Sequence, residues 1–257
     1  DIPGGLALDK EEIAIGPQGG TEQIAIAASQ DWVANTSEPW LMLSPANGVG
    51  SVEGTIKVDS TLSNTLRSTE LSFQGANGQS RKLTVTQFGY GKQIFLKDPV
   101  VEIENSDSYD KRAFESLISA NVECKIGKIE YSFEGDLTDA EKAENENWLL
   151  NSKDEDKLTG TNLGIVLDRK YRPRSVKFKF RWAMNVVPAV RVAKVHLVPV
   201  KAEDQLVDAD GNPTDDVILT VRQKAAPKIE DNRAGDSLSV IMINQKLGSI
   251  ATFDSSD

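Results

Sequence analysis

Leu83-Thr84-Val85-Thr86-Gln87 and Leu219-Thr220-Val221-Arg222-Gln223 are two copies of one five-residue pattern. In each copy, Leu, Val and Gln occupy alternate positions, and the residues between them are Thr or Arg. This is the period of a β-strand that buries one face. A strand that recurs so far along the chain indicates a repeated unit, and a repeat decides the fold before any single element does.

The residues before the two strands also correspond. Trp40-Leu41 precedes the first copy and Trp148-Leu149 precedes the second. Arg67 and Arg172 each lie four residues before the next apolar strand residue. We therefore pair Trp40 with Trp148 and Arg67 with Arg172, and predict two copies of one β-domain.

The length of the chain agrees with two domains. It has 257 residues, of which 39% are hydrophobic and 26% charged, and domains commonly hold about 100–200 residues. We predict a first β-sandwich at residues 1–91 and a second, enlarged by insertions, at 92–226. Residues 227–257 are expected to be a polar linker and the start of a further module, with an apolar run over 238–243.

The first unit alternates apolar and polar residues almost throughout. Its expected strands carry the pairs Leu6/Leu8, Ile13/Ile15, Ile24/Ile26, Trp32/Ala34, Ile56/Val58, Leu71/Phe73 and Leu83/Val85. Asn-Gly at 47–48 and 77–78 supplies the positive φ angles of tight turns. The predicted fold class is all-β, with two tandem immunoglobulin-like antiparallel β-sandwiches.

The second unit is predicted to carry three insertions. The first, over 109–119, has apolar residues at helical spacing. The second, over 135–147, contains a capping box, in which Thr138 is the N-cap and Glu141 bonds back, so a short helix ending near Trp148 is expected. The third, over 182–217, contains residues 190–200, which could form a strand pair. A further strand is expected at Ile165/Leu167.

Residues 6–88 resemble the BACON domain, a β-sandwich module associated with carbohydrate-active proteins of Bacteroidetes. The resemblance is carried by Trp32 and Trp40 before Gly48-x-Gly50, then Asn64-x-x-Arg67, then Leu83-x-Val85-x-Gln87-x-Gly89. The second unit resembles a divergent copy that keeps Trp148, Arg172 and Gln223 and has Tyr131 near the position of Trp32.

The resemblance implies a binding role rather than a reaction. It implies glycans or glycoproteins as partners and an extracellular or cell-surface location, reached through a removed N-terminal signal. Proteins of this arrangement often continue into leucine-rich repeats or an enzyme, so the chain is similar to the front part of a larger surface protein.

Composition excludes several classes of protein. The net charge is −10, which disfavours nucleic acid as a partner, and no run of about 18 apolar residues could span a membrane. His196 is the one histidine and Cys124 the one cysteine. Cys124 sits in an alternating run and is expected to be a buried hydrophobe. We therefore expect no enzyme, no cofactor and no metal.

Candidate binding residues fall into two groups. Trp32, Trp40 and Trp148 could stack on sugar rings, although their repeated positions suit a core role equally. Tyr90, Tyr109 and Tyr171 are expected to be exposed aromatics. In the basic stretch 169–181, Arg172 and Arg174 could bind sulfated or sialylated glycans, or could simply balance the acidic loops 134–156 and 203–216.

Asp208, Asp210 and Asn212 form a weak calcium candidate, because hard cations take clustered oxygen ligands around a Gly turn. A plain Asp/Gly/Asn hairpin turn accounts for the same residues.

The leading hypothesis is a non-catalytic glycan-binding or adhesion module, with mucin or host glycans as candidate ligands. The alternative is a spacer that presents a C-terminal module, and a part of a glycoside hydrolase is a third interpretation. A specific site is expected where the two copies differ, between residues 109 and 216.

Overall fold

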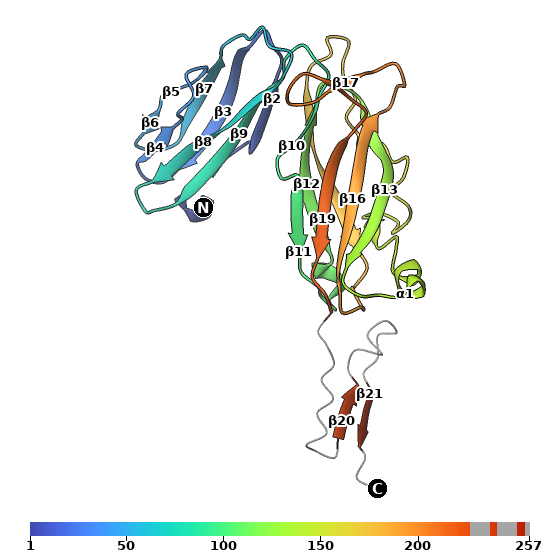
Figure 1. Ribbon diagram of the computed structural model, residues 1–257. Helices are drawn as coiled ribbons and strands as arrows, with labels where there is room; N and C mark the ends of the chain where they lie inside the picture. The colour runs from blue at the N-terminus through green and yellow to red at the C-terminus, as the bar shows by residue number, and fades with distance from the viewer. Residues whose placement is uncertain (227–236, 241–250, 255–257) are drawn as a thin grey trace.

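The computed structural model describes residues 1–226, 237–240 and 251–254. Two antiparallel β-sandwiches follow each other along the chain and meet at one end, where a short linker joins them (Figure 1). The predicted all-β, tandem-sandwich fold class is therefore confirmed.

The first sandwich has two facing sheets, in the orders β1-β3-β7-β5 and β2-β9-β8-β4-β6. A single helical turn, Pro3–Gly5, precedes it. The strands are β1 Leu6–Leu8, β2 Glu12–Ile15, β3 Gly20–Ala28, β4 Trp32–Asn35, β5 Leu41–Ser44, β6 Asn47–Gly48, β7 Val52–Val58, β8 Arg67–Gly75 and β9 Ser80–Gln87.

The second sandwich has sheets in the orders β10-β12-β15-β14 and β11-β19-β16-β13. Its strands are β10 Ile94–Leu96, β11 Val100–Ile103, β12 Ala113–Ala120, β13 Cys124–Glu134, β14 Leu149–Asn151, β15 Arg174–Trp182, β16 Val190–Pro199 and β19 Val217–Gln223. A hairpin of β17 Leu206–Val207 and β18 Pro213–Thr214, the helix α1 Asp139–Glu144 and a helical turn at Tyr109–Lys111 lie outside these sheets.

The two sandwiches share one strand order. In each sandwich, the first two strands lie in different sheets. The first strands, β1 and β10, pair antiparallel with β3 and β12, whereas the second strands, β2 and β11, pair parallel with the last strands, β9 and β19. Strand for strand, β5 matches β14, β7 matches β15, and β8 matches β16. The repeat inferred from the sequence is thus a repeat of topology.

This register corrects one of the paired residues. Arg67 lies opposite Gln87 in the β8–β9 ladder, and Arg191 lies opposite Gln223 in the β16–β19 ladder. The counterpart of Arg67 is therefore Arg191 on β16, whereas the predicted partner, Arg172, precedes β15. We call Trp40, Arg67 and Gln87 the first triad, and Trp148, Arg191 and Gln223 the second triad.

The same register corrects the position assigned to Tyr131. Trp32 pairs with Gly75, eight residues after Arg67, and Cys124 pairs with Pro199, eight residues after Arg191. Cys124 is therefore the counterpart of Trp32. Tyr131 instead packs edge-on against Trp148, with ring centroids 6.0 Å apart.

The three predicted insertions are also revised. Residues 113–120 form the strand β12 and not a helix. The sequence conceals this strand because a polar residue, Ser116, is buried at a core-facing position and interrupts the alternation of apolar and polar residues. Residues 190–199 form one central strand, β16, instead of a strand pair. Ile165 is buried, but no strand forms at 165–167.

The predicted N-cap is present, but the Glu141 side chain accepts from the Thr138 hydroxyl, at 3.0 Å, in place of the Thr138 backbone N–H that a capping box uses. The Glu141 backbone N–H donates to Thr138 Oγ1 at 3.2 Å, and this begins α1. The helix ends at Glu144, before the predicted end near Trp148.

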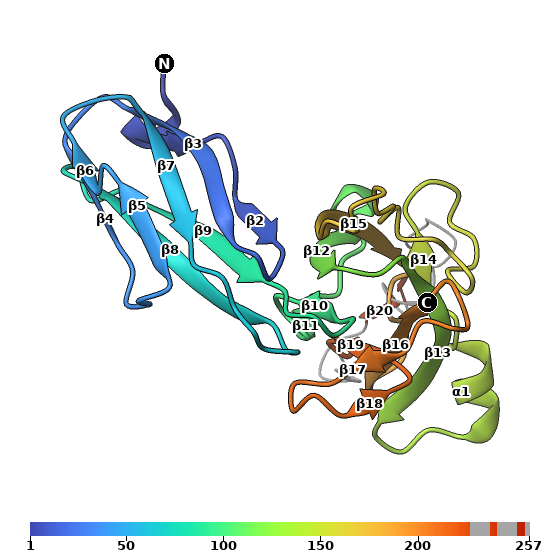
Figure 2. The ribbon, with the colours of Figure 1, turned by 90° about the horizontal axis from the view of Figure 1, so that it is seen from above.

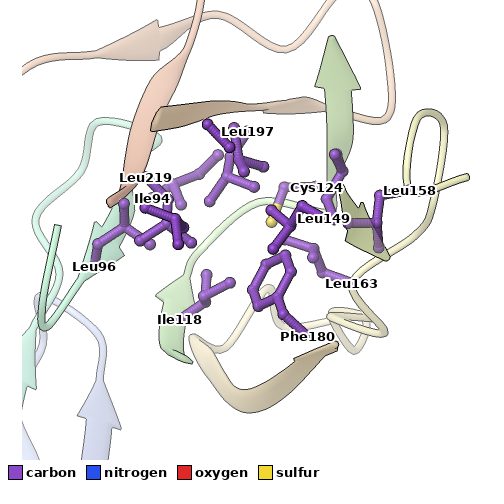
Figure 3. Close-up of a cluster of buried hydrophobic side chains, with 14 of the residues drawn as sticks. Ile94, Leu96, Ile118, Cys124, Leu149, Leu158, Leu163, Phe180, Leu197 and Leu219 are labelled. Carbon is purple, nitrogen blue, oxygen red and sulfur yellow. The ribbon is translucent and has the colours of Figure 1, made fainter. Parts of the chain in front are cut away.

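Each sandwich has its own hydrophobic core between its sheets. Figure 3 shows the core of the second, in which Phe180, Ile118, Leu197 and Leu219 converge with Cys124. Burial raises the pKa of the Cys124 thiol to about 12, so it packs as an uncharged hydrophobe, as predicted.

Beyond the second sandwich, the backbone of β20 Ser237–Val240 pairs antiparallel with β21 Ala251–Asp254. The predicted polar linker, 227–233, and part of the predicted apolar run, 241–243, lie outside the described residues.

Candidate functional site

The candidate site is a cleft of about 450 Å³ where the two sandwiches meet. Seen from above, the ends of β2 and β9 approach the second sandwich beside β10 and β12 (Figure 2). One wall is the 16–20 loop between β2 and β3, the floor is the 88–92 linker, and the other wall is the 170–173 loop before β15. Its polar and aromatic lining includes Gln18, Tyr90, Lys92, Asn121, Tyr171 and Arg172.

The linker Gly89-Tyr90-Gly91 lies tightly against the loop before β8. Backbone N–H groups of Tyr90 and Gly91 donate to the carbonyls of Ser63 and Asn64 at 3.0 and 2.9 Å. A Cβ on Gly91 would lie 2.6 Å from Asn64 O, and one on Gly89 would collide with Ser63 O. The glycines permit this close approach, and the Tyr90 side chain between them is 56% exposed.

Two amides fasten the linker to both sandwiches. Asn121 accepts from the Gln93 backbone N–H at 2.8 Å and donates to Gly91 O at 2.9 Å. The Gln93 side chain accepts from the Leu66 backbone N–H at 2.6 Å and donates to Asp208 O at 3.1 Å. The floor of the cleft is therefore held by bonds to the first and the second sandwich together.

The far wall is organised by Asp168. Its carboxylate accepts from the backbone N–H groups of Lys170 and Arg172 at 2.9 and 3.2 Å, and from Arg172 Nε at 2.5 Å. The hydrogen bond from Arg172 is the main reason that the pKa of Asp168 lies below its usual value. These bonds fold residues 168–172 into a turn with Tyr171 at its tip.

Tyr171 has the most unusual backbone of the cleft. Its φ is +51°, in the left-handed region that bulky residues rarely adopt, and its side chain is 72% exposed. The turn thus holds a strained backbone while projecting an aromatic ring into solvent. Such strain is typically found at functional sites.

The near wall is fixed by the first triad. Gln87 Nε2 donates to Asp59 O at 2.7 Å and to Gly16 O at 3.3 Å, which ties the 16–20 loop to the sheet. Across the joint, Lys177 on β15 bonds Glu11 at 2.5 Å.

The exposed side chains of the cleft suit a sugar. Aromatic rings can pack on the C–H faces of pyranoses, and cationic and amide donors can bind hydroxyl or acidic groups. Arg172 and Lys92 also pair with Asp168 and Asp204, at 2.5 and 2.7 Å. These ion pairs pre-position both cations at the rim.

The rings of the three predicted tryptophans lie in the cores of the sandwiches. Trp32, Trp40 and Trp148 are all buried, so none offers an open ring face. Trp32 Nε1 donates to Gly50 O at 2.9 Å, and Trp40 Nε1 donates to Glu38 at 3.1 Å. Of the alternatives kept open for them, the core role agrees with their burial.

The other predicted residues divide between two places. Tyr171 and Arg172 line the cleft, with Arg174 beside them at 3.6 Å from Asp168. Tyr109 is half exposed and lies elsewhere, in a cavity that also contacts Glu144, next to α1.

Asp208, Asp210 and Asn212 form a turn. Asp208 Oδ1 accepts from the backbone N–H groups of Asp210 and Asn212, both at 2.9 Å, and Gly211 has a φ of +83°. Within the described part of the chain, no three His, Cys, Asp or Glu side chains are grouped to hold a metal ion.

Sequence reasoning did not assemble Tyr90, Lys92 and Gln18 into this site. The available signal was Gly89-Tyr90-Gly91, in which an aromatic residue stands between two glycines at a domain junction. In the residues that the structure describes, no helix has the length and apolar character needed to cross a membrane.

Comparison with solved structures gives low TM-scores. A Bacteroides ovatus GH5 xyloglucanase, in complex with a XXXG heptasaccharide, aligns at 20% identity with a TM-score of 0.32 over 41% of this chain and only 22% of its own. The periplasmic chaperone SfaE aligns at 9% identity and 0.30 over 86% of this chain and 100% of its own. The E. coli chaperone DraB aligns at 8% identity and 0.30 over 83% and 96%.

No curated protein matches the chain in sequence. A family model does match within the first sandwich, from just before β4 to just after β9. Residues 30–88 match the BACON family, described as "Putative binding domain, N-terminal".

Proposed function

We propose that this chain is a non-catalytic glycan-binding module of an extracellular or cell-surface protein, and that the sugar binds in the inter-sandwich cleft. The observation that carries the proposal is the pair of exposed tyrosines in one cleft, with Tyr90 in its floor and Tyr171 in one wall. The match of residues 30–88 to a family of binding domains supports a binding role.

Hydrogen bonds hold the backbone segments that carry these tyrosines. A segment that is ordered before binding loses less conformational entropy when a ligand arrives. Tyr90 is held by the glycine-flanked linker, and Tyr171 by the Asp168 turn. Because both loops are already ordered in the folded protein, the free energy gained by stacking on a ligand is not reduced by ordering them on binding.

The residue inventory of the cleft favours binding over reaction. The tyrosine rings of the cleft offer apolar faces, and its amide, lysine and arginine side chains offer hydrogen-bond donors. Glu22 is the one acidic residue in the lining. Glycoside hydrolysis ordinarily needs two carboxyl groups across the bond that breaks. A hydrolase role is therefore not part of the proposal.

A glycan array probed with the full chain, including mucin-type and plant polysaccharide ligands, tests the proposal. For the strongest ligand, Tyr171→Ala and Tyr90→Ala should each weaken binding about fivefold or more, since an aromatic stacking contact is worth roughly 1 kcal/mol or more. Met42→Ala is the control, because it removes an exposed apolar side chain on β5 that lines neither the cleft nor the cavity beside α1.

Two results would count against the cleft. One is an array with no ligand. The other is a ligand whose affinity is unchanged by both cleft substitutions while circular dichroism shows intact folding.

A second function, a spacer with a fixed bend, is favoured by the joint itself. The Gln93 and Asn121 amides and the Lys177–Glu11 ion pair connect the two sandwiches at separate points. Small-angle X-ray scattering that requires a wide range of inter-sandwich angles would exclude this role and would also remove the pre-formed cleft.

A further inference from the structure

We propose a second binding site in the cavity beside α1, which takes the carboxylate of an acidic sugar and holds it on Arg191. This α1-side cavity has a volume of about 520 Å³ and is lined by Tyr109, Arg112, Glu146, Trp148, Arg181 and Arg191, among others. It shares no lining residue with the inter-sandwich cleft. The two sites can therefore be tested separately.

The floor of the cavity is a buried cation. Arg191 is only 2% exposed, and its guanidinium carbon lies 4.6 Å from the centre of the Trp148 ring. Burial lowers the pKa of Arg191 to about 9, which still leaves the guanidinium charged at neutral pH.

No carboxylate in the described residues pairs with Arg191. Its Nε donates to the Gln223 side chain at 2.5 Å, and a terminal N–H group donates to the Ala183 carbonyl. Both acceptors are neutral. A buried charge without a counter-ion is costly, and a bound anion would relieve that cost.

Other donors around Arg191 have no partner. Trp148 Nε1, Arg181 Nε and Gln223 Nε2 are buried without a hydrogen bond. Trp148 and Arg181 line the cavity directly. Buried polar groups are nearly always satisfied in folded proteins, so two vacant donors on residues that line one cavity indicate a missing acceptor.

The first triad serves as an internal control. There, Trp40 Nε1 donates to Glu38, Gln87 Nε2 donates to Asp59 O, and Arg67 is only half-buried. Glu146 precedes Trp148 as Glu38 precedes Trp40, yet Trp148 has no partner. The same frame is thus fully bonded in one copy and left with free donors in the other.

The rim of the cavity selects among anions. Four acids contribute to it, and all are exposed: Asp107, Glu144, Glu146 and Glu155. Glu155 accepts from the Tyr109 hydroxyl, which leaves the other three facing any ligand. These acids would repel a highly charged anion but can accept hydrogen bonds from hydroxyl groups. A sugar that carries one carboxylate satisfies both the floor and the rim.

The indole N–H signal of Trp148 in a ¹H–¹⁵N spectrum of the full chain reports on the cavity, and Trp148→Phe assigns it. Titration with D-glucuronate should move this signal, whereas the signal of Trp40 should stay in place. Glucose should move neither. Failure of glucuronate and of N-acetylneuraminate to move the Trp148 signal would overturn the proposal.

Arg191→Met should weaken glucuronate binding about tenfold to a hundredfold, because a charged hydrogen bond is lost. Arg67→Met, at the equivalent position of the first triad, should leave it unchanged. If Arg191→Met does not fold, Arg181→Met on the cavity wall replaces it and should also weaken binding. Unchanged affinity in a folded Arg191 or Arg181 variant would overturn the proposal.

Two further probes test the ligand class. N-acetylalanine binding as tightly as glucuronate would assign the site to peptide carboxylates, and glucose 6-sulfate binding more tightly would assign it to sulfate esters. Either result would overturn the acidic-sugar assignment. Loss of the cleft ligand in Tyr171→Ala with glucuronate binding intact would show that the two sites are independent.

Discussion

The two sandwiches share one frame and differ in how fully that frame is bonded. In the first triad, the ring nitrogen of Trp40 and the amide of Gln87 have partners, and Arg67 reaches solvent. In the second triad, Arg191 is buried and the corresponding donors of Trp148 and Gln223 have no acceptor. The same three residue types therefore have their hydrogen bonds satisfied in the first sandwich, whereas in the second they leave unpaired donors beside a cavity.

The second sandwich also has the longer loops. The connection from β5 to β7 is short, whereas the one from β14 to β15 runs over 152–173 and carries the Asp168 turn with Tyr171. The second copy therefore supplies the residues that distinguish the joint, while the first supplies a rigid wall. Of the cleft residues, Tyr171 and Arg172 lie in the range 109–216 where a site is expected, whereas Tyr90 and Lys92 lie outside it.

The largest expected effect is in the second core. Trp148→Ala should lower the unfolding free energy of the second sandwich by about 3–5 kcal/mol, because a buried ring is removed and Arg191 loses its aromatic cover. Trp40→Ala should cost less, since Trp40 is closer to the surface and Arg67 is partly solvated. Calorimetry of both variants checks the order, and a larger loss for Trp40→Ala would reverse the comparison.

The second prediction compares the loss of unfolding free energy when each triad glutamine is replaced by leucine. Gln87→Leu removes bonds to Arg67, Asp59 O and Gly16 O, and should cost about 2–4 kcal/mol. Gln223→Leu removes one bond, but it leaves the Nε group of the buried, charged Arg191 without its acceptor, so it should cost about 3–5 kcal/mol. Urea unfolding of the two variants measures the difference. A lower cost for Gln223→Leu than for Gln87→Leu would mean that Arg191 finds another acceptor.

Tyr171→Gly tests whether the backbone of Tyr171, in the 152–173 loop, is strained or whether its side chain contributes packing. Glycine adopts a positive φ without penalty, so stability should rise by up to about 1 kcal/mol while glycan binding falls. Thermal unfolding and binding are measured on the same sample. A loss of stability would show that Tyr171 has a packing role.

The smallest effect is a pH dependence in the Asp168 turn. Because Arg172 lowers the pKa of Asp168, the turn is stabilised above the ordinary value of 3.8 and loses this support as the pH falls through the lowered folded-state value. Binding in the cleft should therefore be constant from neutral pH to about pH 4 and weaken below it. Asp168→Asn should bind weakly at every pH, and a wild-type decline near pH 6 would point to another group.

Much of the frame could be predicted from local patterns. Period-two alternation found the seven strands with the strongest apolar pairs in the first unit, and Thr138 with Glu141 predicted the start of α1. Each signal depends on neighbours in sequence, which is why it can be seen in a single chain.

The errors have tertiary causes. Ser116 faces the core of β12 and disguised that strand as a helix. The sequence pattern places the central strand β16 in an insertion, so it predicts Arg172, and not Arg191, as the arginine of the repeat. Both proposed sites join segments distant in sequence, and no local pattern brings Tyr90 to Tyr171 or Tyr109 to Arg191.

The parallel pairing of β2 with β9, and of β11 with β19, has a mechanical consequence. Because β2 and β11 run in the same direction as the last strands of their sandwiches, tension applied along the chain slides each pair lengthwise. All the hydrogen bonds of a ladder then resist together instead of opening one after another. A force applied between the two ends of the chain would therefore load both sandwiches in shear, which such a ladder withstands better than the unzipping of an antiparallel edge.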